Sequence, residues 1–218
     1  HLCDRRQRQM CIRDSTHFML NLYGSDAEGD RNDYERFVSD VAFQPDEVKL
    51  YPCVLVEGTG LVAKHDAGEW RPYSEDELIA LLAHDICATP TFTRVSRMIR
   101  DISAQDIIAG SKKTNLRQMV EASEILHDQA VREIRYREIA GEEVDTNDLR
   151  LDEVAYETTN TSERFLQWVT PRGKIVGFLR LSLPHVEYMT IHASELPEEL
   201  GCAMIREVHV YGQVANLH

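Results

Sequence analysis

The pattern of apolar and polar positions changes along the chain, and its first half predicts an α/β arrangement. Residues 74–88 have helical apolar spacing, and Ser74 with Glu77 forms a capping box at their start. Their apolar stripe consists of Leu78, Leu81, Leu82 and Ile86. Residues 34–43 also have helical spacing, with Tyr34, Phe37, Val38 and Val41 on one face. Residues 48–58 are an almost uninterrupted apolar run, typical of a strand buried on both faces of a parallel sheet. Helix, buried strand and helix in succession indicate an α/β fold.

The second half is predicted to be β-rich. Residues 165–170 and 174–183 flank a Pro-Arg-Gly turn and are expected to form a hairpin. Residues 203–214 alternate as a strand does. One predicted face carries Ile205, Glu207, His209 and Tyr211, and the other carries Arg206, Val208 and Val210. The acidic stretch 141–153 is the expected boundary between the two halves.

The segments between these elements carry shorter sequence patterns that predict loops, a turn and one further helix. Residues 21–33 are rich in Gly, Asp and Asn and predict a loop, whereas residues 114–129 predict a capped helix. The Gly-Thr-Gly at 58–60 is too short to hold a phosphate and is expected to be a turn after the strand. Trp70 and Tyr73 are expected to pack against a loop.

Residues 1–15 differ in character from the rest of the chain. They contain four arginines, which favours either a basic nucleic-acid arm or a transit peptide. A third interpretation fits better, because residues 5–14 match the translation of a common transposase sequencing adapter in one reading frame. We therefore expect residues 1–15 to be an adapter-derived scar and the natural sequence to be a fragment.

Charge is distributed unevenly. The chain has 218 residues and a formal net charge of −13, which by itself argues against a nucleic-acid binder. Residues 94–137, however, contain nine Lys/Arg and six Asp/Glu, a local charge of +3. The local charge of residues 94–137 is therefore a better guide to binding partners than the net charge of the whole chain.

Cysteine usage gives no metal or disulfide signature. Outside the first fifteen residues, Cys53, Cys87 and Cys202 are widely spaced and form no C-x-x-C motif. No metal site is therefore predicted, and a reducing cytoplasm is the expected location. No run of eighteen apolar residues exists, so no membrane partner is expected.

Six stretches, in order along the chain, carry a resemblance to a known family. They are NLYGSD (21–26), PDEVKLYPCVLVEGTGL (45–61), TRVSRMIRDISAQDIIAG (93–110), TNLRQ (114–118), IRYREI (134–139) and IREVHVYGQV (205–214). Together they resemble the catalytic subunit of Elongator, a radical-SAM and GNAT acetyltransferase-like enzyme of the tRNA wobble uridine. Many members carry cysteines at the places occupied here by Val131 and Tyr136, so a metal clip there is not expected.

The resemblance implies a fold, cofactors and partners. Residues 16–141 would be the C-terminal part of a radical-SAM, partial TIM-like barrel with basic connecting helices. Residues 142–218 would be a truncated GNAT-type α+β domain that binds acetyl-CoA. A 4Fe-4S cluster and S-adenosylmethionine are implied, with the cluster ligands upstream of this sequence. The implied partners are tRNA, acetyl-CoA, and either further copies of the chain or Elongator-like subunits.

The implied RNA contacts lie in the basic window. They are Arg94, Arg97, Arg100, Lys112, Lys113, Arg117, Arg135 and Arg137. Lys and Arg contacts with phosphate supply affinity without reading the base sequence. Arg94, Arg97 and Arg100 would share one side if their segment were helical. The alternative is that these residues pair with nearby acids and stabilise the fold.

The implied acetyl-CoA contacts are Glu207, Val208, His209 and Val210, whose strand would pair with the pantetheine arm. Glu207 is also a candidate general base. The alternative is a half-buried strand in which Glu207 pairs with Arg206 or Arg180.

The resemblance implies that the intact enzyme adds a carboxymethyl group to the wobble uridine, and that this fragment alone is inactive. Two other functions stay open. One is a protein lysine acetyltransferase in which Glu207 deprotonates the amine. The other is a non-catalytic tRNA-binding module.

Overall fold

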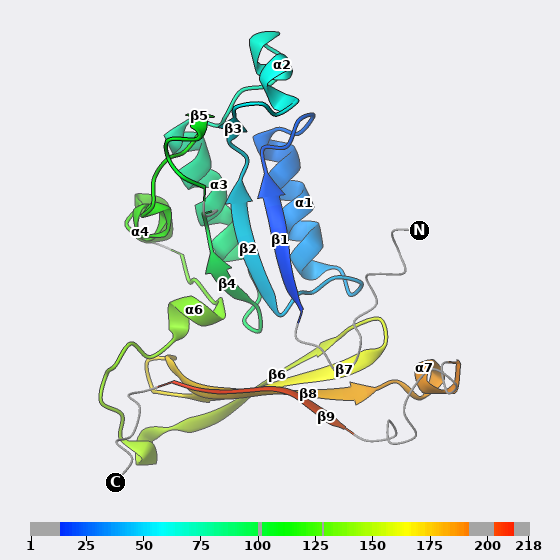
Figure 1. Ribbon diagram of the computed structural model, residues 1–218. Helices are drawn as coiled ribbons and strands as arrows, with labels where there is room; N and C mark the ends of the chain where they lie inside the picture. The colour runs from blue at the N-terminus through cyan, green and yellow to red at the C-terminus, as the bar shows by residue number, and fades with distance from the viewer. Residues whose placement is uncertain (1–13, 100–101, 128, 192–202, 212–218) are drawn as a thin grey trace. The chain divides into compact units, whose positions relative to one another are not determined.

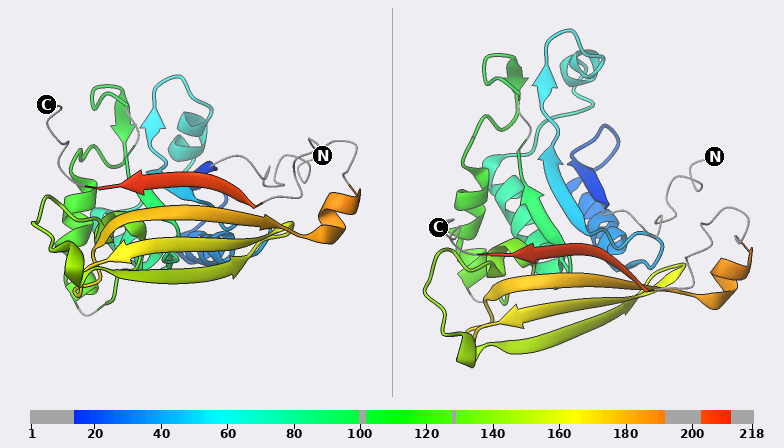
Figure 2. Two further views of the ribbon diagram at one scale, coloured as in Figure 1. Left: turned by 90° about the horizontal axis from the view of Figure 1, so that it is seen from below. Right: turned by 60° about the horizontal axis from the view of Figure 1, so that its bottom comes forward.

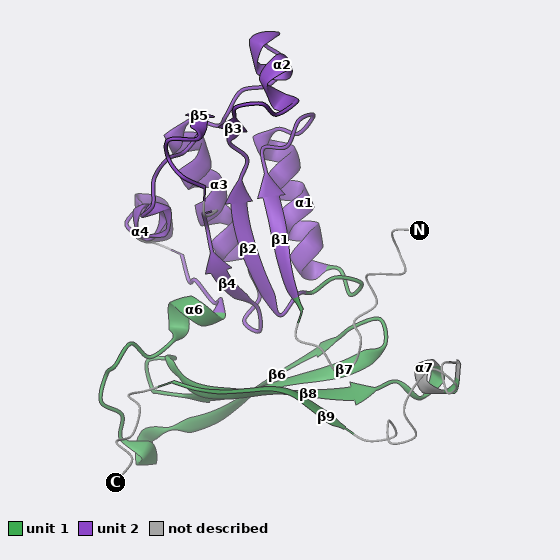
Figure 3. Cartoon of the chain, viewed as in Figure 1, with its two compact units in different colours: residues 1–14, 40–44, 134–218 green, residues 15–39, 45–133 purple. Residues whose placement is uncertain are grey.

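The chain folds into two compact units, each built on its own sheet. The computed structural model describes residues 14–99, 102–127, 129–191 and 203–211. Residues 15–39 and 45–133 form one unit, which we call the parallel-sheet unit, and it is purple in Figure 3. Residues 1–14, 40–44 and 134–218 form the other, the antiparallel-sheet unit. The chain passes from the first unit to the second for the last time between residues 133 and 134, and the boundary predicted at 141 stays a prediction.

The parallel-sheet unit has the predicted α/β arrangement. Its strands β1 (Ser15–Leu20), β2 (Glu47–Pro52) and β4 (Arg94–Arg97) are parallel and lie in the order β1-β2-β4. Helices α1 (Ala27–Ser39) and α3 (Glu75–Ala88) lie side by side over one face of this sheet (Figure 1). Parallel neighbours need such helical crossovers, which explains the alternation of helix and strand in the sequence.

The core of this unit lies between the sheet and the two helices. Val48 and Leu50 from β2 are fully buried there, as are Leu82 and Ile86 from α3. The predicted central strand is confirmed over residues 47–52 and is buried on the face toward the helices, whereas Lys49 on the other face is partly exposed, so burial on both faces is not confirmed. The predicted capping box is confirmed as well, because the Ser74 amide donates to Glu77 (2.8 Å) and the Glu77 amide donates to the Ser74 hydroxyl (3.2 Å).

Helix α1 begins earlier and ends earlier than predicted. Asp26 caps it, since its carboxylate accepts from the Gly29 amide at 2.8 Å and its carbonyl from the Asp30 amide at 2.9 Å. The predicted loop is therefore confined to residues 21–26. Val41 lies beyond the end of the helix and is 51% exposed, so its assignment to the apolar face was wrong.

The helix predicted over residues 114–129 is wrong, because the structure has two short helices there. These are α4 (Leu116–Glu121) and α5 (Glu124–His127). Asn115 at the start of α4 makes no side-chain cap hydrogen bond. The Ser123 hydroxyl donates to the Val120 carbonyl at 2.7 Å, and such local hydrogen bonds compete with continuation of a helix.

Smaller elements surround the carboxyl ends of the parallel strands. Two short strands, β3 (Leu55–Val56) and β5 (Ile107–Ala109), pair antiparallel. The predicted turn at 58–60 is confirmed, with Gly58 at φ 75°, and it leads into α2 (Leu61–Asp66). Trp70 contacts the loop after β1, as predicted, whereas Tyr73 donates to Asp30 on α1.

The antiparallel-sheet unit contains four strands in sequential order. They are β6 (Arg150–Glu157), β7 (Thr161–Val169), β8 (Ile175–Pro184) and β9 (Met204–Val210), as Figure 2 shows. Short helices α6 (Ile134–Arg137) and α7 (Val186–Ile191) and the 3-10 turn η1 (Thr146–Asp148) complete the described elements. The predicted hairpin is confirmed as β7–β8, and its turn is closed by Gly173 at φ 77°.

Two expectations concern the ends of the chain and membranes. Most of the adapter-like segment lies outside the described residues, although Ser15, which we assigned to it, begins β1. No helix in the described part of the chain combines the length and apolar character needed to cross a bilayer.

Candidate functional site: strand β9 and the basic residues

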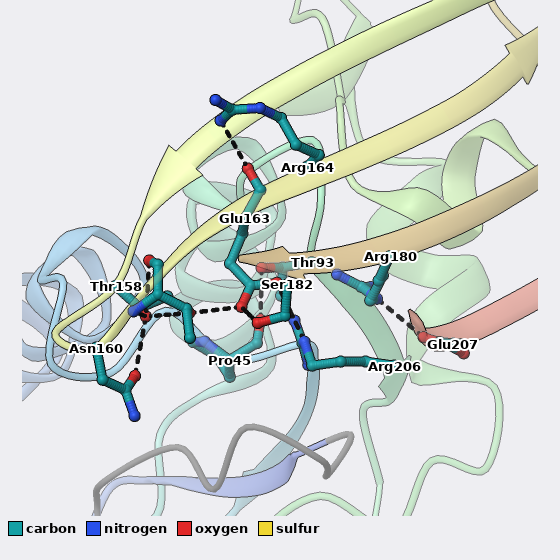
Figure 4. A network of polar contacts seen from close by, with 11 residues as sticks. Pro45, Thr93, Thr158, Asn160, Glu163, Arg164, Arg180, Ser182, Arg206 and Glu207 are labelled. Atoms are coloured by element: carbon teal, nitrogen blue, oxygen red, sulfur yellow. Dashed lines mark hydrogen bonds and ion pairs between the residues drawn. The ribbon is translucent and has the colours of Figure 1, made fainter. Parts of the chain in front are cut away.

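A buried carboxylate organises the polar interior of the antiparallel-sheet unit. Glu163 on β7 accepts hydrogen bonds from Thr161 (2.7 Å) and Ser182 (2.6 Å) through one oxygen. Its other oxygen accepts from Arg206 on β9, from Nη2 at 2.8 Å and Nε at 3.1 Å. The side chains of Glu163 and Arg206 are each 1% exposed. We call Thr161, Glu163, Ser182 and Arg206 the Glu163 cluster, and Figure 4 labels the last three of them.

A second ion pair joins β8 to β9 beside this cluster. Arg180 Nε lies 2.9 Å from Glu207, and the two side chains are 2% and 11% exposed (Figure 4). The Arg180 guanidinium also lies over the rings of Phe165 and Phe178, at 5.0 and 5.4 Å from their centroids. Glu207 is therefore fixed against a buried cation.

The alternation predicted for the last strand fails at Arg206. Leu181 pairs with Ile205 and Arg180 pairs with Glu207, so Arg206 is an extra residue in β9. Such a β-bulge shifts the alternation by one position. Arg206 and Glu207 consequently both reach buried partners on the other strands, although consecutive residues of a regular strand point to opposite faces.

These contacts bear on the predicted role of Glu207. A general base must be able to accept a proton from its substrate, whereas this carboxylate is already engaged by an arginine. The contact matches the alternative reading of a half-buried strand with Glu207 paired to Arg180. It favours a structural or orienting role for Glu207 over that of a general base.

The rest of β9 is accessible. Among the described strands it is an edge strand, and Val208 and Val210 are 61% and 77% exposed. His209 stacks on Phe178 with an interplanar angle of 11° and contacts Tyr211 at 4.3 Å between centroids. An exposed edge with small apolar side chains fits the amides and methyl groups of a pantetheine arm.

The predicted RNA contacts on β4 adopt a different geometry from the one expected. Arg94 and Arg97 lie in a strand, so the helical interpretation is wrong, and Arg100 lies outside the described residues. Arg94 pairs with Glu47 and Arg97 with Lys49, across an irregularity in the register. Residues two apart in β2 share a face, so Arg94 and Arg97 still lie on one face of the sheet.

Sequence reasoning missed two further basic side chains on this face. Lys49 pairs in register with both Arg97 and His17, so the three lie in a row across the sheet. Lys49 Nζ lies 3.3 Å from His17 Nε2. Their signal was weak, because Lys49 is an isolated cation within a predicted apolar run and no strand was predicted around His17.

The remaining predicted RNA contacts divide by environment. Arg117 is held inside the fold, because it contacts Glu121 at 3.2 Å and Glu133 at 3.5 Å and donates to the Val95 carbonyl. Lys113 lies 3.5 Å from Glu75, and Lys112 is exposed. In the antiparallel-sheet unit, Arg135 is exposed, whereas Arg137 donates to Gln167 at 2.9 Å. Arg97, Lys112, Lys113 and Arg135 are thus the exposed cations among the described residues of the predicted set.

The loop after β1 is held in place by a buried aspartate. Asp30 accepts from the Asn21 amide (2.6 Å), Ser25 (2.6 Å) and Tyr73 (2.8 Å). The Trp70 indole donates to the Asn21 carbonyl at 2.9 Å. Burial and the hydrogen bond to Asp30 raise the pKa of Tyr73 well above its ordinary value. The Asn21–Ser25 loop is therefore a rigid feature at the carboxyl end of β1, where ligands of parallel sheets usually bind.

The described residues do not fit an iron–sulfur cluster. No group of three or more His, Cys, Asp or Glu in the described part of the chain could hold a metal ion. Val131 is buried and Tyr136 is 39% exposed, and neither side chain is a metal ligand of the cysteine type. No reaction step can be assigned to a cluster from these residues.

Comparisons with known proteins agree with this architecture. The family model for the radical SAM C-terminal domain matches residues 45–126. The chain is 32% identical over 91% of its length to the tRNA uridine(34) acetyltransferase of Methanocaldococcus jannaschii. It is also 31% identical, over 91% of its length, to Elongator complex protein 3 of Homo sapiens.

A solved structure shows the same similarity. Elp3 of Methanocaldococcus infernus, with an N-terminal deletion, superposes with a TM-score of 0.80 at 31% identity over 91% of this chain. The chain spans 47% of that structure, 37% of the M. jannaschii protein and 36% of the human protein. The similarity therefore covers nearly all of this chain and less than half of each relative.

Proposed function

We propose that this chain, which belongs to the Elongator catalytic subunit family, is part of an enzyme that modifies uridine 34 of tRNA. The observation that carries this proposal is the similarity over 91% of the chain to a protein named for that reaction. The match with Elp3 spans the same share of the chain, so it takes in both sheets rather than one shared domain.

The intact enzyme would add a carboxymethyl group to the uridine. When bound, S-adenosylmethionine and a 4Fe-4S cluster would supply radical chemistry, and acetyl-CoA would supply the two-carbon unit. On this proposal the parallel-sheet unit is the end of a radical-SAM barrel, and the antiparallel sheet is the beginning of a GNAT-type domain. The cluster would be held by residues other than those described here.

The parallel-sheet unit would contribute to RNA binding. Lys112 and Lys113 are exposed lysines close to one another in sequence, and Arg97 is exposed on β4. Such side chains bind phosphates without reading bases, which suits a substrate recognised by its shape. Arg117 would act differently, by holding β4 and α4 together.

The antiparallel-sheet unit would contribute β9 to acetyl-CoA binding. The backbone of Val208–Val210 at the strand edge would hydrogen-bond the pantetheine amides, and the exposed valines would contact its methyl groups. Glu207, paired with Arg180, would keep this segment of β9 in register rather than move a proton. The proposed partners are Elongator-like subunits or further copies of the chain, and the proposed location is the cytoplasm.

Binding by the chain itself tests this proposal. We expect tRNA to bind with an affinity that falls steeply as salt rises, because phosphate contacts release counterions. Replacing both Lys112 and Lys113 with Ala should weaken binding and reduce the salt slope by about 1.4 to 1.8, at 0.7 to 0.9 per contact. Lys64→Ala, which removes an exposed lysine paired with Glu69, is the matched control.

The outcomes separate the candidate functions. Binding of both tRNA and acetyl-CoA supports the proposal. Binding of tRNA without acetyl-CoA would favour a non-catalytic RNA-binding module. Binding that is insensitive to both lysines, with the same salt slope as wild type, would contradict the predicted RNA surface.

A further inference from the structure

The bulge in β9 has an identifiable cause in the side chains around it. An extra residue in a strand loses its place in the hydrogen-bonded ladder and must be stabilised by other contacts. Arg206 is that residue, and its guanidinium reaches across β8 to Glu163 on β7. The bulge therefore coincides with a long-range ion pair.

Both carboxylate oxygens of Glu163 accept hydrogen bonds. One oxygen takes two hydroxyl donors and the other takes two guanidinium nitrogens, at distances between 2.6 and 3.1 Å. A further hydroxyl, on Thr158, lies 2.7 Å from that of Thr161 and extends the network. Both guanidinium donors converge on one carboxylate oxygen while hydroxyl groups occupy the other, which restricts where the arginine can lie.

We propose that Glu163 is a positioning residue that sets the register of β9 by holding Arg206 in the bulge. When Glu163 binds Arg206, Glu207 lies opposite Arg180 in the strand register. Val208, His209 and Val210 then lie on the faces of the sheet that the structure shows. Without the bulge, the residues on one side of it would shift by one position, and every side chain there would change face.

The consequence concerns the acyl-carrier site. This part of the inference rests on the proposed function, because it takes β9 as the strand that binds the pantetheine arm. A one-residue slip would exchange the backbone groups that point away from β8 for those that point toward it. Glu163, which does not itself reach the strand edge, would thus control affinity for an acyl-pantetheine thioester.

The test compares two glutamates on neighbouring strands of one sheet. Glu163→Gln removes the charge and keeps the size, whereas Glu153→Gln on β6 removes an exposed charge that lies 3.0 Å from Arg164. Amide hydrogen exchange is measured across the sheet, and acetyl-CoA is titrated into each variant. Amides of the β7–β8 pair report whether the sheet remains folded.

In Glu163→Gln we expect exchange of the β9 amides to accelerate at least about tenfold, with β7–β8 amides unchanged. Affinity for acetyl-CoA should fall at least about fivefold in the same variant. Glu153→Gln should match wild type in both measurements. Equal exchange in the two variants would overturn the inference.

Two further measurements distinguish failure of the inference from unfolding of the variant and from failure of the proposed function. If Glu163→Gln unfolds the whole sheet, Arg206→Lys retains the charge but loses the fork, so β9 exchange should still rise while β7–β8 stays protected. Unchanged β9 exchange in Arg206→Lys would then overturn the inference. If wild type does not bind acetyl-CoA, the proposed function fails, while the exchange data still decide whether Glu163 positions β9.

Discussion

At the scale of single residues, a buried aspartate in the parallel-sheet unit has an incompletely satisfied carboxylate. Asp85 on α3 is fully buried, and its Oδ2 atom has no hydrogen-bond partner. Burial raises the pKa of its carboxyl to about 6 from an ordinary 3.8, although neighbouring His84 acts in the opposite direction. Across from it on α1, Asp30 raises this pKa and Arg31 lowers it.

Asp85 should make stability depend on pH. The folded protein holds the proton of the Asp85 carboxyl more tightly than the unfolded chain does. Burial of Asp85 therefore does not destabilise the fold below about pH 4, and its destabilising contribution grows as pH rises to about 6. It then stays constant at roughly 3 kcal/mol, from the difference between the two pKa values. We predict that Asp85→Asn is more stable than wild type at pH 7 and loses this dependence. Urea unfolding at pH 4.5 and pH 7 measures both effects, with exposed Asp76→Asn as control.

Glu133 offers a second prediction at this scale. It is fully buried, accepts from the Val95 amide at 3.0 Å and lies 3.5 Å from Arg117. Glu133→Ala would leave the Arg117 charge without its buried partner, so we expect a loss of about 3 to 5 kcal/mol in the free energy of unfolding. Glu121→Ala removes the more exposed partner of the same arginine and should cost less than about 1 kcal/mol. Similar losses in the two variants would contradict this account.

At the scale of elements, predictions held where the signal was local. Helix α3 was predictable because its cap and its stripe lie within one stretch of fifteen residues, and β2 because its apolar run is continuous. The break between α4 and α5 was not, since it depends on which hydroxyl binds which carbonyl. The strand β4 was missed because its polar residues were read as a basic helix face.

In the candidate site, too, only local features could be predicted from the sequence. That Glu207 would pair with Arg180 or Arg206 could be foreseen from the sequence. The bulge could not, because it depends on Glu163, which lies 43 residues before Arg206 and two strands away. Lys49 and His17 were also missed, since only strand order brings them beside Arg97.

The cap of α3 gives a prediction for an element. The pKa of Glu77 is lowered to about 2 by Arg71 and by the Ser74 amide, so this carboxylate stays charged and capping persists at mildly acidic pH. Ser74→Ala should cost about 1 kcal/mol of stability. Thermal unfolding against Ser103→Ala, in an exposed turn, isolates the contribution of the cap. Equal melting temperatures for the two variants would show that the capping box is not stabilising.

At the scale of the whole molecule, the proposed function requires two chemistries in one polypeptide. In the proposed function, the parallel-sheet unit contributes cations that bind RNA, and the antiparallel-sheet unit contributes a strand edge that binds a thioester carrier. We predict that this chain binds tRNA and acetyl-CoA without catalysing the modification on its own. Nucleoside analysis of tRNA incubated with the chain, acetyl-CoA and S-adenosylmethionine should detect no modified uridine, and any modified product would contradict this prediction.

The most direct test uses the product of the complete gene with tRNA, S-adenosylmethionine and acetyl-CoA labelled with carbon-13 in the acetyl group. Mass spectrometry of the digested tRNA should find both labelled carbons in a carboxymethyl group on uridine 34. Label in protein lysines and none in tRNA would contradict the account, as would label in neither.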